Sequence, residues 1–258
     1  MTRTRVARVT GGFVRHVRLA PDTGLDRYPF SLPVVQWLSL AGGLDLDGSV
    51  TFLVGDNGTG KSTLVEALAV AAGFNSEGGS QSFRFATRAT ESGLGDHLVL
   101  RWGRKPQTGF FLRAESFYNV ATEIERLDAD PGSPPLLPAY GGVSLHERSH
   151  GESFLDLVIH RFGPNGLYLL DEPEAALSVR GCLALVRRIG DLVEQGSQFI
   201  VATHSPILLA VPNARILQVD IDGTIEQVDY DAAEPVTLTR GFLADPARFL
   251  HHLFTDEN

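Results

Sequence analysis

The chain has 258 residues, of which 43% are hydrophobic and 21% charged, the composition of an ordinary globular protein. Its net charge of -9 argues against a protein that coats nucleic acid through bulk electrostatics. No apolar stretch approaches the roughly 20 residues of a membrane-spanning helix, residues 1–18 lack the pattern of a secretory signal, and a single cysteine, Cys182, excludes an internal disulfide. We therefore expect one cytoplasmic domain, residues 1–258, without direct membrane insertion.

Apolar runs typical of strands alternate with helical patterns along the chain, which predicts an α/β fold with a mainly parallel sheet. Residues 50–54 form the first run and precede a helical pattern over residues 62–72. Residues 167–170 and 198–202 form two more runs, on either side of a helical pattern over residues 178–194. Parallel strands need crossover helices of this kind. We therefore place the core in two parts of the chain, at about residues 45–75 and 165–220.

Three further regions lie outside this core. Between about residues 83 and 113, the runs at residues 98–102 and 109–112 resemble strands of a smaller antiparallel sheet. Residues from about 114 to 162 are predicted to form a helical subregion. A helical tail is expected over about residues 236–256.

The first strand runs directly into the segment GDNGTGKST, which matches the P-loop pattern and opens a helix. Glycines at this position let the backbone turn tightly, so that successive N–H groups point at phosphate oxygens. Lys61 adds a positive charge, Ser62 offers a hydroxyl to Mg²⁺, and Thr63 can reach the α-phosphate of ATP. The alternative is a glycine-rich turn without a ligand. The predicted nucleotide-binding residues are Gly55, Asp56, Asn57, Gly58, Thr59, Gly60, Lys61, Ser62 and Thr63.

Two adjacent carboxylates, Asp171 and Glu172, end the apolar run at residues 167–170. In a parallel sheet this position lies at the same edge as the P-loop. We expect Asp171 to hold Mg²⁺ and Glu172 to polarise the attacking water as general base. A carboxylate pair after a strand is also common in solvated turns, but the P-loop beside it favours the catalytic role. The sequence thus predicts a Mg²⁺-dependent ATPase, with Lys61 as a further catalytic residue.

The segment RSHGES, residues 148–153, precedes the carboxylates, and the segment THSP, residues 203–206, follows them. Together with the P-loop they resemble the ATP-binding-cassette (ABC) superfamily, and most closely the compact stand-alone bacterial ATPases of the RecF-, OLD- and SMC-like group. In RSHGES, Ser149, Gly151 and Glu152 match the ABC signature motif, while His150 replaces a glycine. The resemblance implies that this segment binds the γ-phosphate held by a second copy, and hence a head-to-tail homodimer that forms on ATP binding. Ser149 and Glu152 also fit a plain capping box.

Two segments after the carboxylates also resemble ABC motifs. EAALS, residues 174–178, resembles the D-loop, with Ser178 in place of the usual aspartate. In FIVATHSP, residues 199–206, an apolar strand ends at His204. His204 resembles the switch histidine that contacts the γ-phosphate, and the resemblance implies that it is catalytic. A lone histidine at a strand end is otherwise a common surface residue.

Two assignments rest on position relative to these motifs. FFLRAESF, residues 110–117, stands where the family has its Q-loop, with Glu115 in place of glutamine. Glu115 is a candidate to orient a metal-bound water, or it merely caps the following helix. The family commonly stacks adenine on an aromatic residue upstream of the P-loop, and Tyr28 or Phe30 stands at a suitable distance, with a core aromatic as the alternative.

The resemblance implies a soluble ATP-driven switch or motor for a partner in DNA repair or phage defence, where DNA itself is a possible partner. The alternatives are the nucleotide-binding subunit of a membrane transporter and a nucleotide-binding scaffold that hydrolyses little ATP. Residues 115–149 leave no room for the long coiled-coil arm of the SMC group. A local basic stripe for nucleic acid is possible on the acidic body, and its candidates are Arg84, Arg88, Arg101, Arg104, Lys105 and Arg113.

Overall fold

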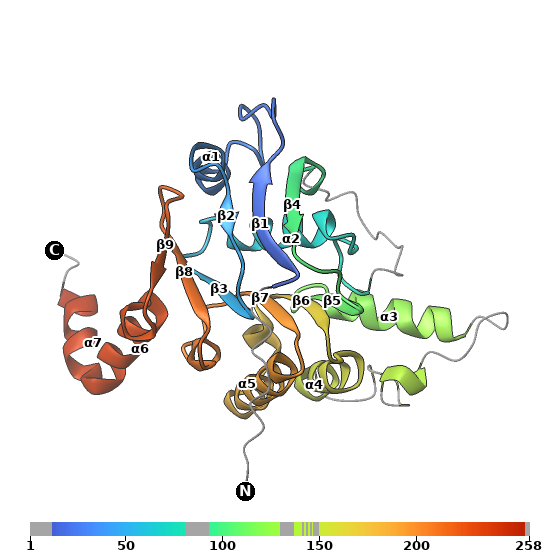
Figure 1. Cartoon of the computed structure of the whole chain (residues 1–258). Coiled ribbons are helices and arrows are strands. Elements are labelled where there is room, and N and C mark those ends of the chain that lie inside the picture. The colour runs from blue at the N-terminus through green and yellow to red at the C-terminus, as the bar shows by residue number, and fades with distance from the viewer. Residues whose placement is uncertain are drawn as a thin grey trace, which may run out of the picture.

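The computed structural model describes residues 12–80, 93–129, 137–140, 142, 144, 146 and 150–255. A six-stranded sheet with the strand order β5-β6-β7-β3-β8-β9 forms the centre of the molecule (Figure 1). Strands β5 to β8 in this order are parallel to their neighbours, and β9 pairs antiparallel with β8. The strands are β3 (Val50–Val54), β5 (Thr108–Arg113), β6 (Gly166–Asp171), β7 (Gln198–Ala202), β8 (Arg215–Val219) and β9 (Ile225–Val228).

A smaller antiparallel sheet with the order β2-β1-β4 packs on one side of the main sheet. Its strands are β1 (Val14–Leu19), β2 (Leu44–Asp45) and β4 (Leu98–Trp102). The predicted fold class, a mainly parallel core with a smaller antiparallel piece, is confirmed.

One strand was assigned to the wrong sheet. Residues 109–112 were predicted to belong to the antiparallel piece, but β5 lies at the edge of the main sheet and pairs in parallel with β6, from Thr108 opposite Gly166 to Arg113 opposite Asp171. The apolar run of β5 suits either sheet, so only the partner strand decides where it lies. This pairing brings the end of β5 beside the predicted metal ligand.

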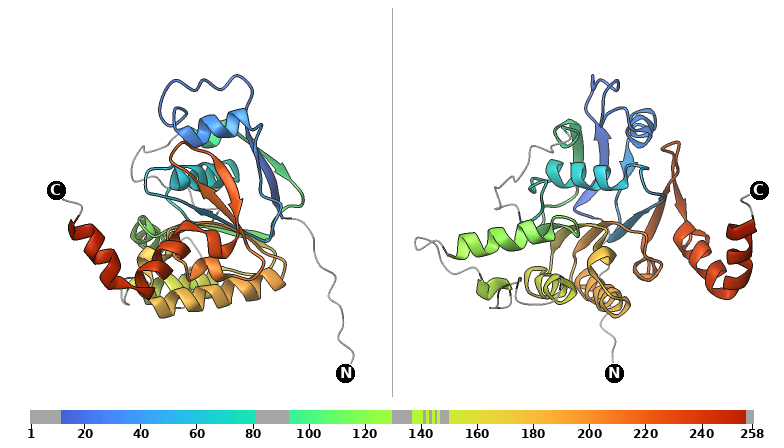
Figure 2. Two further views of the ribbon diagram at one scale, coloured as in Figure 1. Left: turned by 90° about the vertical axis from the view of Figure 1, so that its left-hand side faces the viewer. Right: turned by 180° about the vertical axis from the view of Figure 1, so that it is seen from behind.

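Seven α-helices in the described part of the chain surround the two sheets (Figure 2). They are α1 (Pro33–Leu40), α2 (Lys61–Ala71), α3 (Phe117–Asp128), α4 (His150–Arg161), α5 (Val179–Glu194), α6 (Glu234–Ala244) and α7 (Pro246–Thr255). Helices α3, α4 and α5 share one apolar core with the main sheet, while α1, α2 and the antiparallel sheet share a second. Helices α6 and α7 project beyond β9, and none of the helices described is long and apolar enough to cross a membrane.

A buried glutamine at the start of β7 joins the two sheets. The Oε1 atom of Gln198 accepts a hydrogen bond from the Val14 N–H at 2.9 Å. Its Nε2 atom lies 2.9 Å from the carbonyl oxygens of Val14 and Leu46 and 3.1 Å from that of Gly48. Because these backbone groups are buried, each needs such a partner. Gln198 therefore satisfies groups of β1 and of the chain leading into β3.

Replacing this glutamine tests its role in holding the sheets together. Gln198→Leu leaves several buried backbone groups without a partner, so we expect a loss of about 3 kcal/mol in the free energy of unfolding. Urea unfolding followed by circular dichroism measures it. The control is Gln227→Leu on β9, where the side chain is exposed and accepts a hydrogen bond from Arg215, and where we expect a change below about 0.5 kcal/mol. Equal effects of the two changes would contradict this role.

Candidate functional site

The predicted site residues converge at the carboxyl-terminal edge of the parallel strands. Arg113 ends β5 opposite Asp171 at the end of β6, and Asp171 in turn lies opposite Ala202 at the end of β7. The P-loop leaves β3, whose residue Leu53 pairs with Ala202. Segments spread along the chain from Leu53 to Ala202 therefore meet at one edge, where open α/β sheets bind their ligands.

The P-loop turns sharply through glycines and leads into α2. Gly60 precedes the helix with a φ of 91°, in the left-handed region, and a Cβ atom there would lie 2.6 Å from Cγ1 of Val34. The loop tip at Asp56, Asn57 and Gly58 is exposed, which leaves it open to a ligand. A loop of this shape at a helix N-terminus presents backbone N–H groups to an anion.

Lys61 begins α2 and lies buried beneath the loop. Its Nζ atom donates a hydrogen bond to the carbonyl oxygen of Asp56 at 2.7 Å, which holds the ammonium group inside the turn. Burial lowers the pKa of Lys61, and the carboxylates of Glu172 and Asp171 act in the opposite direction. The site thus combines a desolvated cation with two carboxylates.

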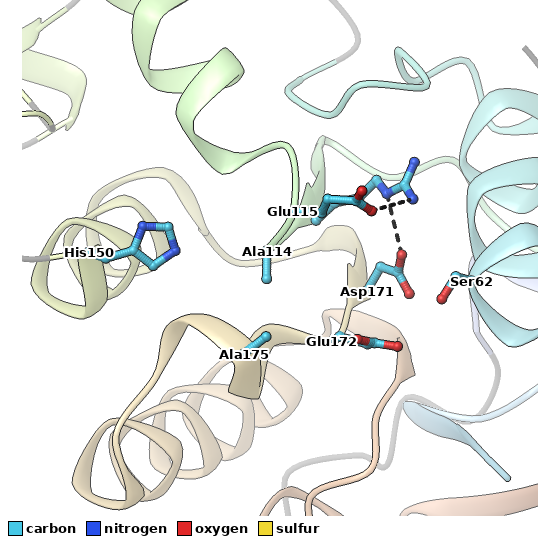
Figure 3. A pocket seen from close by; sticks show the side chains of 8 residues that line it. Ser62, Ala114, Glu115, His150, Asp171, Glu172 and Ala175 are labelled. Atoms are coloured by element: carbon cyan, nitrogen blue, oxygen red, sulfur yellow. Dashed lines mark ion pairs between the residues drawn. The ribbon is translucent and has the colours of Figure 1, made fainter. Parts of the chain in front are cut away.

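Asp171 is buried, and its two oxygens have different surroundings. Oδ2 lies 3.3 Å from Nε of Arg113, whereas Oδ1 has no hydrogen-bond partner among the described residues. Burial raises the pKa of Asp171, and Arg113 and the hydroxyl of Ser62 partly counter this. Figure 3 shows the Ser62 hydroxyl and the Asp171 carboxylate pointing toward one another.

These residues fit a magnesium ion. A buried carboxylate oxygen without a partner is costly, and a cation beside it would remove that cost. Mg²⁺ prefers oxygen ligands and is commonly bound by one or two protein groups together with phosphate oxygens and water. Ser62 and Asp171 offer such a pair next to the P-loop.

Glu172 leaves the strand in an unusual conformation. Its φ and ψ angles are 48° and 50°, a left-handed conformation that is costly for a residue with a side chain and that is typical of functional sites. Its N–H donates to the carbonyl oxygen of Ala202 at 3.0 Å, which fixes the turn. The Oε1 atom lies 3.7 Å from Nε2 of His204, and the Glu172 side chain is 42% exposed. A carboxylate so placed can polarise a water molecule.

A cavity of about 350 Å³ opens in front of these groups (Figure 3). Ser62 and His150 lie on opposite sides of it, so the cavity reaches from the P-loop helix to the start of α4. Its lining residues are Ser62, Arg113, Ala114, Glu115, His150, Asp171, Glu172 and Ala175.

Comparisons with known proteins agree with this geometry. A family model described as "AAA domain, putative AbiEii toxin, Type IV TA system" matches residues 50–121. The chain is 32% identical over 186 residues to the cytochrome c biogenesis ATP-binding export protein CcmA of Rhodopseudomonas palustris, a match that covers 66% of this chain and 84% of that protein. The chain belongs to the ABC family of ATPases. It is therefore an ATP-binding protein of the ABC type.

Sequence identity is lower in two further matches. The macrolide export ATP-binding/permease protein MacB of Hahella chejuensis is 28% identical over 203 residues, which cover 69% of this chain and 29% of that protein. The SMC head domain from Thermotoga maritima is 17% identical with a TM-score of 0.39, over 72% of this chain and 92% of that one.

In the segment that resembles the ABC signature, the described residue His150 lines the cavity. Ser149 lies outside the described residues, whereas Gly151 and Glu152 form the first turn of α4. A Cβ atom at Gly151 would lie 3.0 Å from the carbonyl oxygen of Ala176, so the helix start packs closely against the segment after Glu172. The roles of Ser149, Gly151 and Glu152 toward a nucleotide stay predictions.

The segment of residues 174–178, which resembles a D-loop, contains two residues with defined contacts, Ser178 and Glu174. Ser178 caps α5, because its hydroxyl accepts from the Gly181 N–H at 3.2 Å. Glu174, four residues earlier, accepts a hydrogen bond from the backbone N–H of His204 at 2.5 Å. Glu174 therefore joins the segment after β6 to the segment after β7, a contact 30 residues apart in the chain that no local motif could indicate.

Two predictions at the Q-loop region need correction or refinement. Glu115 lines the cavity, but its side chain is 88% exposed and its described ion pair is with Arg113 at 3.6 Å. Arg113 was predicted as part of a basic surface stripe, and it lies instead in the site against Asp171. Arg104, another stripe candidate, donates to the Gly196 carbonyl oxygen at 2.6 Å and stacks over Phe13. The prediction of a basic surface stripe is therefore wrong for Arg104 and Arg113, because both guanidinium groups have partners within the protein.

The two aromatic candidates for adenine differ in exposure. Phe30 is 5% exposed and packs edge-on against His97 at 5.0 Å, so it is a core residue. Tyr28 is 69% exposed, and the segment that follows it contacts the P-loop where Leu32 and Val34 approach Gly60. Tyr28 therefore stays the candidate for stacking on adenine.

The backbone conformation of the P-loop gives a testable prediction. Gly60→Ala forces a side chain into the left-handed region and against Val34, so we expect a loss of about 1–2 kcal/mol in stability and weaker ATP binding. Thermal unfolding with and without ATP measures both. The control is Gly190→Ala in α5, where a Cβ atom meets nothing within 4 Å and where we expect a gain of about 0.5–1 kcal/mol. A Gly60→Ala protein as stable and as responsive to ATP as the unchanged protein would refute the assignment.

Proposed function

We propose that this chain binds ATP with Mg²⁺ and hydrolyses its terminal phosphoanhydride bond. The observation that supports this proposal is the unpaired, buried Oδ1 atom of Asp171, which faces Ser62 beside a P-loop. Ser62 and Asp171 would hold the metal, which when bound supplies charge neutralisation to the phosphates. Lys61 binds phosphate oxygens, Glu172 orients the attacking water, and His204 donates a hydrogen bond to the terminal phosphate.

We further propose that the active form is a head-to-tail homodimer in the cytoplasm. Side chains of the catalytic pair, Glu172 and His204, are 42% and 35% exposed, so a single copy does not exclude water from them. Hydrolysis sites commonly need such exclusion. In this proposal Ser149, Gly151 and Glu152 of one copy cover the nucleotide held by the other, as the resemblance to the ABC signature implies.

Removing the P-loop cation tests nucleotide binding and turnover. Lys61→Ala should lower ATP hydrolysis at least about a hundredfold, because the buried ammonium is lost from the phosphates. A steady-state phosphate-release assay with Mg²⁺ measures it. Lys105→Ala, at an exposed position away from the site, serves as the control and should change the rate by less than about twofold. Retention of the full rate by Lys61→Ala would end the assignment.

Replacing the proposed base separates binding from chemistry. Glu172→Gln should bind ATP with nearly unchanged affinity, hydrolyse it about a hundredfold or more slowly, and accumulate as a dimer on a sizing column. Glu226→Gln, an exposed position on β9, is the control and should behave as the unchanged protein. Normal turnover by Glu172→Gln would show that another group activates the water.

For the biological role we propose an ATP-driven switch or motor for a partner that acts on DNA, in repair or phage defence. Its support is the motif subtype, with a THSP ending and an SHGES signature. The alternative, a nucleotide-binding subunit of a transporter, is favoured by the relatives whose names describe export proteins.

Proteins and nucleic acids that co-elute with the ATP-loaded Glu172→Gln dimer distinguish these roles. The switch predicts co-eluting DNA or a DNA-acting protein, and a DNA-stimulated ATPase rate that falls as salt rises. An integral membrane protein in the same fraction would favour the transporter role instead.

A further inference from the structure

Arg113 is the residue of the site whose role the ABC motifs do not supply. It ends β5, its side chain is 20% exposed, and three carboxylates surround its guanidinium group. Nη1 lies 2.8 Å from Glu66, Nε lies 3.3 Å from Asp171, and Nη2 lies 3.6 Å from Glu115. The dashed lines in Figure 3 mark the pairs with Asp171 and Glu115.

These three partners hold the guanidinium unequally. Glu66 and Asp171 are 13% and 7% exposed, so their pairs with Arg113 lie away from water and are weakly screened. Glu115 is 88% exposed and stands farthest away, and exposed pairs of this kind contribute little. One edge of the guanidinium is therefore anchored, while the Nη2 edge has only a loose, solvated partner.

The guanidinium of Arg113 belongs to the cavity beside the P-loop, where ATP would place its phosphates. Arg113 lines the same cavity as Ser62, the first residue after the P-loop lysine, and as Glu172. A guanidinium is planar and always charged, and its paired N–H groups match phosphate oxygens as well as they match carboxylate oxygens. A phosphate group of higher charge than Glu115 would displace that carboxylate from Nη2.

We propose that Arg113 binds the terminal phosphate of ATP within its own chain, with Glu66 and Asp171 as anchors and Glu115 as the carboxylate that the phosphate replaces. Arg113 thus distinguishes a nucleoside triphosphate from a diphosphate. This proposal rests on the proposed function, because it requires ATP in the P-loop. It differs from a purely structural role, in which Arg113 only neutralises Asp171 and Glu66.

Nucleotide affinities measured without metal test the contact directly. In EDTA, Arg113→Gln should weaken ATP binding about tenfold, the value of one charge-assisted hydrogen bond, and change ADP binding by less than about twofold. Titration calorimetry measures both. Equal weakening of ATP and ADP, or a weakening of ATP binding that occurs only with Mg²⁺, would overturn the proposal, because the arginine would then act through the fold or through Asp171.

Two further variants keep this test interpretable. The double change Arg113→Gln with Glu66→Gln removes one of the two buried carboxylates, Glu66 and Asp171, that lose their partner in the single change. It should show the same selective loss for ATP; loss for neither nucleotide or for both would contradict the contact. Glu115→Gln removes the competing carboxylate and should strengthen ATP binding about threefold, whereas unchanged or weaker binding would contradict the exchange.

A control separates this inference from the proposed function. Lys61→Ala should weaken the binding of both ATP and ADP, since the P-loop holds the phosphates that the two nucleotides share. If the unchanged protein bound neither nucleotide, the proposed function would fail. If it bound both and Arg113→Gln left their ratio unchanged, only the role of Arg113 would fail.

Discussion

The arrangement of the site depends on one buried carboxylate. Asp171 stands at the end of a strand with neighbours on both sides, so its charge is removed from water and its pKa is raised by burial. Arg113 compensates one of its oxygens, and the other has no partner among the residues described. A fold that keeps such a group in its interior gains stability when a cation binds there. A cation bound at Asp171 would therefore stabilise this edge of the sheet.

Positively and negatively charged side chains lie next to one another at the carboxyl-terminal edge of the main sheet. Lys61 enters from α2 and Arg113 from β5, so two fixed cations lie on either side of the carboxylates at the end of β6. The backbone N–H of His204 donates a hydrogen bond to Glu174, which joins the turn after β6 to the turn after β7. Because neighbouring strands carry these groups, a shift of one strand would displace several of them together.

Local motifs predicted the site well and the pairing of distant segments less well. The P-loop and the Asp171–Glu172 pair were predictable because each is contiguous and follows an apolar strand. The position of β5 was not, since its apolar run does not specify a partner strand. Arg113 was missed for the same reason: only its pairing opposite Asp171 turns a surface cation into a site residue. The contact of Gln198 with Val14, 184 residues away, likewise follows from packing alone.

The central claim is that Asp171 and Ser62 together bind the metal that accompanies ATP. Electron paramagnetic resonance of Mn²⁺, titrated into the protein with protein in excess of ATP so that little unbound ATP competes for the metal, measures the metal affinity of the site. With Asp171→Asn the amide retains the shape of the side chain and loses its charge, and we expect Mn²⁺ binding to weaken at least about tenfold. Unchanged Mn²⁺ affinity in Asp171→Asn would contradict the account.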